Sequence, residues 1–374
     1  MSVAVDDSPI VPFPWFGGKS KIAPVVWELF GNADTFVEPF CGSAAVLFKR
    51  PNVHQWWNKV ETINDADGHL VNTLRAIRDH SGELVELLQD PVNEADLTAR
   101  HLYLTQRRSE VVDALVSDPH WCDVQQAAWW VWGISQWVGG EWCTGEGSFD
   151  GGNPADGAVY RKMPMVAGSH PGRGIHRHPG LRVAATDGAP PPVRSLITEQ
   201  RRMLLEALAD RLARVRITCG DWQRVTKSAM DPARSGGFTA VFLDPPYDPM
   251  LRRGGLYAGG DASGSRSGVE GQIGFDVADL GESALPVHDK ALQWALHNGS
   301  QSNLKIIYCG YADADVSERF AEAGWKEVNW KASGGYGLQS VVNRARGNRD
   351  KERVWVSPVC VSAASDFIGQ GTLC

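Results

Sequence analysis

Residues 237–250, "GFTAVFLDPPYDPM", constrain the fold more than any other stretch of the chain. The unbroken apolar run "AVFL", bounded by glycine and proline residues, is typical of a strand buried on both faces of a parallel sheet. Pro245 and Pro246 cannot continue a hydrogen-bonded ladder, so the strand must end at Asp244. The chain therefore places a carboxylate, two rigid residues and the Tyr247 ring at the end of a buried strand.

Strand-like and helix-like segments alternate on both sides of a central insertion. Strands are predicted at residues 35–37, 60–63, 215–219, 240–243, 304–311 and 352–358, and helices at residues 44–49, 70–77 and 287–297. Strands alternating with helices favour an α/β fold in which helices cover both faces of a parallel sheet.

The sequence divides into a catalytic domain and an inserted region. The predicted boundaries are a flexible tail at 1–11, a catalytic domain at 12–80 and 215–360, an insertion at 81–214 and a C-terminal tail at 361–374. The insertion begins with helices and a tryptophan cluster, which we interpret as core packing. It continues through a Gly-, Pro- and His-rich stretch, 139–193, and ends in an amphipathic helix at 196–215. A second long loop is predicted at 251–284.

Four acidic residues lie at the ends of candidate strands, namely Glu38, Asp65, Asp221 and Asp244. One acid at a strand end is most often a solvated turn residue, but ligands of open parallel sheets bind beyond the carboxyl ends of the strands. The chain has neither a GxGxxG pattern nor a GxxxxGK[ST] phosphate loop. Acidic residues at strand ends, without a loop that binds phosphates, favour S-adenosylmethionine as the cofactor over NAD or ATP, because S-adenosylmethionine has no phosphate groups.

Bulk properties indicate an ordinary globular protein with no membrane span. The 374 residues carry a net charge of −7, which argues against a uniformly basic nucleic-acid surface. Seven scattered cysteines without a CxxC pair fit reduced thiols. The N-terminal residues do not resemble a secretory leader, and no apolar run approaches the length of a membrane span, so we expect a cytoplasmic protein.

Four motifs in order carry a family resemblance: "PWFGGKSKI", "FVEPFCGSAAVLF", "INDAD" and "LDPPYDP". Together they resemble the Dam-like (D12 class) adenine-specific DNA methyltransferases. The resemblance implies a Rossmann-like S-adenosylmethionine-dependent methyltransferase sheet with an inserted target-recognition region. It also implies methyl transfer from S-adenosyl-L-methionine to the N6 amine of a flipped-out adenine in double-stranded DNA, without a metal.

The resemblance carries roles to individual positions of this chain. It implies that Trp15 and Lys19 help enclose the cofactor, that Asp65 binds the ribose hydroxyls, and that Asp244 lies where the cofactor and adenine pockets join. The remaining implied cofactor residues are Glu38, Phe40 and Asp221. Ser43 stands where the family often has a second glycine, a change that the turn should accept.

The Asp-Pro-Pro-Tyr loop suits the activation of an amine. An adenine amine is a poor nucleophile because its lone pair is delocalised into the ring. The Asp244 carboxylate and the Pro245 carbonyl are acceptors for its hydrogens, and they favour the pyramidal nitrogen that attacks a methyl group. Pro245 and Pro246 organise these acceptors in advance, which is where electrostatic catalysis is most effective. Tyr247 offers a ring on which the target base can stack.

DNA contact requires basic residues, and residues 160–216 supply them. This segment holds eleven Lys or Arg side chains against four Asp or Glu. Arg173, Arg177 and Arg182 are therefore predicted to bind DNA. A solvated loop and helix face explains the same charges about equally well. A second basic segment is residues 343–353.

Other functions remain open on the sequence alone. One alternative is the same chemistry on adenine in RNA or on the N4 amine of cytosine, although Asp rather than Ser at the head of the DPPY motif favours adenine by resemblance. Another is a catalytically silent DNA-binding relative, which would have no use for a complete cofactor pocket. The motifs do not show whether a companion restriction endonuclease exists.

Overall fold

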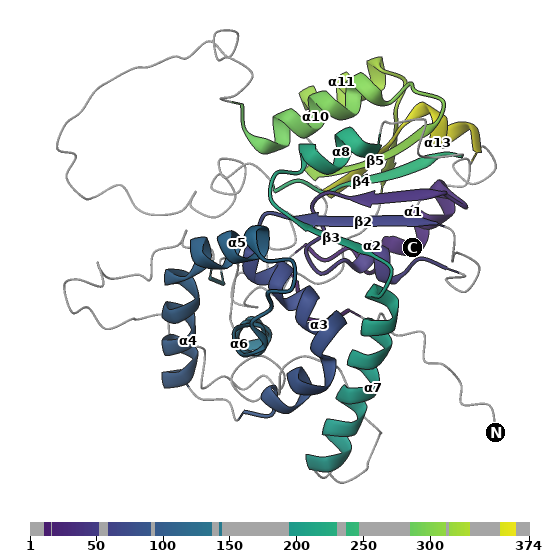
Figure 1. Ribbon diagram of the computed structural model, residues 1–374. Coiled ribbons are helices and arrows are strands. Elements are labelled where there is room, and N and C mark those ends of the chain that lie inside the picture. The colour runs from purple at the N-terminus through teal and green to yellow at the C-terminus, as the bar shows by residue number, and fades with distance from the viewer. Residues whose placement is uncertain are drawn as a thin grey trace, which may run out of the picture. The chain divides into compact units, whose positions relative to one another are not determined.

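The computed structural model describes an α/β protein (Figure 1), as the sequence predicts. The structure describes residues 11–15, 17–51, 59–90, 94–136, 142–143, 194–229, 237–246, 285–311, 314–329 and 352–363. The strands are β1 Thr35–Glu38, β2 Val60–Asp65, β3 Arg216–Cys219, β4 Thr239–Leu243, β5 Leu304–Tyr311, β6 Lys326–Asn329 and β7 Glu352–Val356. The helices are α1 Ala23–Phe30, α2 Ala45–Phe48, α3 Gly68–Leu87, α4 Glu94–Gln106, α5 Arg108–Ser117, α6 Val124–Gln136, α7 Arg194–Leu212, α8 Gln223–Ala229, α10 Val287–Asn298, α11 Ala314–Glu322 and α13 Pro358–Ala363.

The described strands form a seven-stranded sheet in the order β3-β2-β1-β4-β5-β7-β6. β1 pairs in parallel with β2 and β4, and β2 pairs in parallel with β3. β7 is antiparallel to both β5 and β6. Every residue of β4 is buried, as its apolar run predicts. This arrangement confirms the predicted fold class, a Rossmann-like sheet of the kind that S-adenosylmethionine-dependent methyltransferases use.

Contacts between residues group the described chain into two units, one ending at Val241 and the other beginning at Phe242. In the first unit, α3 packs against α5, α6 and α7 (Figure 1). In the second unit, Phe320 stacks on Trp355 at 5.0 Å between ring centroids and anchors α11 to β7. The first unit holds most of the residues that the motifs single out.

The elements of the first unit follow from local sequence. α3 begins where the Asp67 carboxylate caps it, accepting hydrogen bonds from the amides of His69 and Leu70 at 2.9 and 3.4 Å. The predicted helix at 70–77 is therefore the first half of a longer one, which bends at His80, a residue with non-helical backbone angles. α7 confirms the predicted amphipathic helix, with Leu205, Leu208 and Leu212 all buried.

Several predicted features lie outside the described residues. These are residues 1–10 of the N-terminal tail, 364–374 of the C-terminal tail, nearly all of the 139–193 stretch and the whole of the 251–284 loop. Among the helices that the structure describes, none has both the length and the apolar composition to cross a membrane.

Candidate cofactor and active site

The first component of the site is the turn that follows β1, residues 41–44. Gly42 has a φ of +49°, and its amide donates a hydrogen bond to Asp65 Oδ2 at 3.0 Å. The other carboxylate oxygen, Oδ1, accepts the amide of Asp67 at 3.0 Å. Asp65 therefore ties the end of β2 to the turn after β1, and it also caps its own turn into α3.

The indole of Trp15 lies over this turn. A Cβ at Gly42 would collide with Nε1 of Trp15 and would approach Cδ1 to 2.8 Å, so only glycine leaves room for the ring. Trp15 packs beside Phe13 and Trp130, with ring centroids 6.1 Å away in both cases. Trp130 belongs to α6, so this helix contributes one wall of the aromatic cluster. Its indole Nε1 is buried and has no hydrogen-bond partner among the described residues.

Replacing Gly42 with alanine tests whether this turn is needed. Gly42→Ala is expected to destabilise the protein by about 1–3 kcal/mol, because a non-glycine residue is strained at positive φ and the methyl group collides with Trp15. Urea unfolding followed by tryptophan fluorescence measures the loss. The matched variant Gly82→Ala, in α3, adds a methyl group in open surroundings. If both variants were equally stable, Trp15 would not pack on Gly42 in solution.

Asn64 joins three strand ends and was not singled out by the sequence. Its amide nitrogen donates to the carbonyls of Pro39 at 3.0 Å and Gly220 at 2.9 Å. Its side-chain oxygen accepts the hydroxyl of Thr218 at 2.9 Å. Asn64 is 1% exposed, and its hydrogen bonds reach the segments that follow β1 and β3. β2 reads VETIND, and Asn64 is one of four polar residues in it, so its sequence carried no signal that singled out Asn64.

Burial raises the pKa of Asp65 from 3.8 to about 6, and the amide hydrogen bond from Asp67 partly opposes this. The desolvated carboxyl therefore gains most from partners that stabilise its ionised form, such as hydroxyl donors. Nearby Cys41 is also buried, and burial together with the charges of Asp65 and Glu38 raises the pKa of its thiol. Cys41 therefore stays protonated and is not a nucleophile.

Glu38, Phe40 and Lys19 all lie in the first unit, and two of the three are buried. Glu38 is 2% exposed, and its Oε2 accepts the amide of Leu47 in α2 at 3.3 Å. Lys19 is 4% exposed, and its ammonium donates to the carbonyl of Gly17 at 2.8 Å. Phe40 is half-buried.

Asp221 lies apart from this buried group, on an exposed turn after β3. Its Oδ1 accepts the amide of Gln223 at 2.7 Å, which caps the start of α8. The neighbouring Trp222 is buried and packs against Phe40 at 5.5 Å between ring centroids. The turn after β3 therefore meets the turn after β1 through these two rings, and Trp222 is a residue that the sequence reasoning missed.

Asp244 directly follows β4 and is half-buried, while Pro245 is buried and Pro246 is exposed. In the same unit the Tyr308 hydroxyl donates to the His288 carbonyl at 3.3 Å. Burial is the main cause of a raised Tyr308 pKa, and the Asp289 and Asp244 charges add to it. Tyr308 is therefore a neutral donor in the neighbourhood of the Asp244 carboxylate.

Some predicted site residues fall outside the described residues. These are Tyr247 in the DPPY loop and the three DNA-contact candidates Arg173, Arg177 and Arg182. Their roles stay predictions.

Comparison with known proteins agrees with the motifs. A curated relative, the Type II methyltransferase M1.LlaDCHI of Lactococcus lactis subsp. cremoris, is 30% identical over 97 residues. The aligned part covers 26% of this chain and 31% of the relative, so the match spans about a third of the relative's length. Residues 15–124 match the sequence model of the family described as D12 class N6 adenine-specific DNA methyltransferase. This segment includes Trp15, Gly42 and Asp65, and over it the chain shows the D12 class resemblance that its motifs indicate.

Proposed function

We propose that this protein transfers a methyl group from S-adenosyl-L-methionine to the exocyclic N6 amine of adenine in double-stranded DNA. The observation that carries the proposal is the match to the D12 class over residues 15–124. The packing of Trp15 over Gly42, beside the half-buried Asp65 carboxyl, supports it because these are the positions that would hold the cofactor.

The residues around the turn after β1 suit this cofactor. Asp65 offers carboxylate oxygens to the ribose hydroxyls, and Glu38 and Asp221 add acidic groups in the same unit. Trp15 and Phe40 offer apolar surface. The Nε1 of buried Trp130, which has no hydrogen-bond partner in the part of the chain that the structure describes, adds a donor beside the Trp15 ring. Lys19 helps to enclose the site. When bound, the cofactor supplies an electrophilic methyl group on sulfur.

The chain's own chemistry is to prepare the amine. The Asp244 carboxylate and the Pro245 carbonyl accept hydrogen bonds from the two N6 hydrogens, which localises the nitrogen lone pair. The bound cofactor would supply the methyl carbon to this nitrogen and leave as the neutral thioether, and N6 would release one proton to solvent. β4, which ends directly before Asp244, is parallel to β1, which supports placing both strand ends at one edge of the sheet.

The adenine must leave the duplex to reach this loop, at a cost of roughly a few kcal/mol. In this proposal Tyr247 stacks on the flipped base, and Pro246 holds the loop in shape. Arg173, Arg177 and Arg182 neutralise DNA phosphates, which makes binding depend on salt.

The test is to identify the methylated product. The protein is incubated with isotope-labelled S-adenosylmethionine and unmodified double-stranded DNA, and the labelled nucleoside is identified by mass spectrometry after digestion. Label in N6-methyldeoxyadenosine supports the proposal. Label in N4-methyldeoxycytidine, or in RNA alone, favours the alternative substrates. If the protein bound DNA but transferred no labelled methyl group to it, the protein would be a catalytically silent DNA-binding relative.

Cofactor affinity is expected to depend on pH through Asp65. Because the pKa of Asp65 is raised to about 6, affinity should fall as pH drops below about 6, by up to tenfold per pH unit. The unfolded carboxyl titrates near 3.8, so the folded protein holds an extra proton between about pH 4 and 6, and stability should fall as pH rises through that window.

Calorimetric titration of the cofactor between pH 5 and 7 measures the affinity. Asp65→Asn should bind more weakly and show a flat profile over this window. A wild-type affinity that does not change with pH would remove the Asp65 carboxylate from the ribose site.

A further inference from the structure

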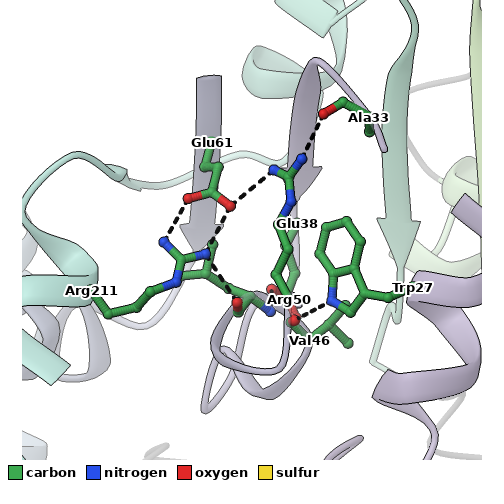
Figure 2. A network of polar contacts seen from close by, with 8 residues as sticks. Trp27, Ala33, Glu38, Val46, Arg50, Glu61 and Arg211 are labelled. Atoms are coloured by element: carbon green, nitrogen blue, oxygen red, sulfur yellow. Dashed lines mark hydrogen bonds and ion pairs between the residues drawn. The ribbon is translucent and has the colours of Figure 1, made fainter. Parts of the chain in front are cut away.

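A buried network of polar contacts joins the last turn of α7 to the segment that carries the cofactor turn (Figure 2). Glu61 of β2 lies at its centre, and the Arg211 guanidinium binds both carboxylate oxygens, with distances of 2.6 and 2.8 Å. Arg50 donates to the same carboxylate at 3.0 Å and to the Ala33 carbonyl at 2.6 Å. Arg211 also donates to the Leu47 carbonyl at 3.1 Å.

Arg211 binds α2, a helix of only four residues, through the Leu47 carbonyl. A helix of one turn leaves most of its amides and carbonyls without partners inside the helix, so groups from outside supply further hydrogen bonds. The Leu47 carbonyl also accepts the backbone amide of Arg50 at 3.2 Å. At the carbonyl end, Trp27 Nε1 donates to the Val46 carbonyl at 2.7 Å, and Arg211 donates to the Leu47 carbonyl. At the amide end, Glu38 accepts the Leu47 amide. A carboxylate at the amide end and a cation at the carbonyl end both complement the helix dipole.

α2 begins directly after the cofactor turn. Its first flanking residue, Ala44, has a φ of +53°, and Gly42 two residues earlier has a φ of +49°. Left-handed backbone at a non-glycine residue is costly and persists only where surrounding contacts hold it. On one side, Asp65 holds this turn through its hydrogen bond from the Gly42 amide. On the other side, Glu38 and Arg211 hold α2, which follows the turn directly.

The shape of the Arg211 side chain matters as much as its charge. The planar guanidinium binds two carboxylate oxygens with separate nitrogens while one of those nitrogens also reaches the Leu47 carbonyl. Lysine keeps the charge but cannot reproduce this fork, because its ammonium is a point donor on a flexible stem. Arg211→Lys therefore removes the geometry and keeps the charge.

We infer that Arg211 is a positioning residue for the cofactor turn, and that the insertion thereby completes the cofactor site. Glu38, which the motifs place in that site, and Arg211, which comes from the last turn of α7, bind the amide and the carbonyl of one residue, Leu47. In the sequence, α7 follows Arg173, Arg177 and Arg182, the three residues proposed to contact DNA. The inference rests on the proposed function.

The first measurement is cofactor affinity in Arg211→Lys. We expect the dissociation constant for S-adenosylmethionine to rise about fivefold or more, the effect of losing one hydrogen bond that orients the site. Arg202→Lys is the matched control, because Arg202 lies on the same helix and pairs with exposed Glu86 at 2.6 Å. It should bind the cofactor as the wild type does.

The second measurement separates positioning from loss of stability. Leu208→Ala removes a buried side chain of α7 that takes no part in the polar network. In the protein without cofactor, hydrogen exchange of a peptide covering residues 41–50 should become about fivefold faster in Arg211→Lys. It should change less in Leu208→Ala, even where that variant melts at a lower temperature.

The outcomes are distinct. Weaker cofactor binding and faster exchange in Arg211→Lys, with neither in Arg202→Lys, support the inference. Unchanged exchange at residues 41–50 in folded Arg211→Lys overturns it, and so does an equal change in Leu208→Ala. If the wild-type protein does not bind S-adenosylmethionine, the proposed function fails, and the exchange data still decide whether Arg211 holds the turn.

Discussion

Asp244→Asn is expected to slow methyl transfer by about 10²–10³-fold when cofactor and DNA are both saturating, as is typical when one preorganised electrostatic group is lost. Asparagine keeps the size of the side chain but replaces one acceptor oxygen with a donor amide. An acceptor whose hydrogen bond strengthens as the target nitrogen becomes pyramidal acts on the transition state, so the loss should fall on kcat. Single-turnover methylation measures this step directly.

The structure offers a control for this variant in the same unit. Asp315 lies in the first turn of α11, and its exposed side chain is 3.7 Å from Arg319. Asp315→Asn makes the same chemical change away from the proposed site and should transfer methyl at the wild-type rate. If Asp244→Asn also kept the wild-type rate, the DPPY loop would be a turn with no part in the chemistry.

Glu61→Ala is expected to lower the free energy of unfolding by about 3–5 kcal/mol, because it leaves two buried cations without their shared partner. The Arg50 side chain is fully buried, and that of Arg211 is 12% exposed. Burial already lowers the pKa of Arg50 to about 10, while the charge of Glu61 opposes that effect. At neutral pH Arg50 stays charged, so it cannot escape the loss by deprotonation.

The control for this prediction removes another glutamate that pairs with an arginine of α7. Glu86 pairs with Arg202, and the two side chains are 57% and 34% exposed. Glu86→Ala should cost at most about 1 kcal/mol, since exposed ion pairs are weak. Urea unfolding of both variants gives the comparison. A similar, small loss in each would mean that water reaches the Glu61 network in solution.

The sequence by itself predicted the features that depend on short stretches of chain. The buried strand β4 was evident from four consecutive apolar residues, and its end from two prolines. The parallel pairing of β1 with β2 and β4, and of β2 with β3, followed from the alternation of strands with helices, and α7 followed from the spacing of its leucines. The alternation did not predict that β7 is antiparallel to β5 and β6. These features are local, because backbone geometry and side-chain periodicity act over a few residues.

The sequence also placed acids at strand ends but could not assign their contacts. Asp65 was expected only as a ribose partner, and the structure adds a structural role in which it holds the Gly42 turn. Asp221 was grouped with Glu38, yet one is exposed and the other is buried. Which acid is desolvated depends on how neighbouring segments cover it, and the pattern of one strand does not contain that information.

Only the tertiary structure decided which distant side chains meet. Arg211 and Glu61 are 150 positions apart, and Asn64 bonds to Gly220 across 156 positions. Trp130 reaches Trp15 because α6 packs on α3, which no motif records. Such contacts depend on the order of strands in the sheet and on helix packing, both of which minimise exposed apolar area over the whole domain. The periodicity of a short segment does not show how much apolar area the whole domain buries. The contact between Arg211 and the segment after the cofactor turn could therefore be found only in the folded chain.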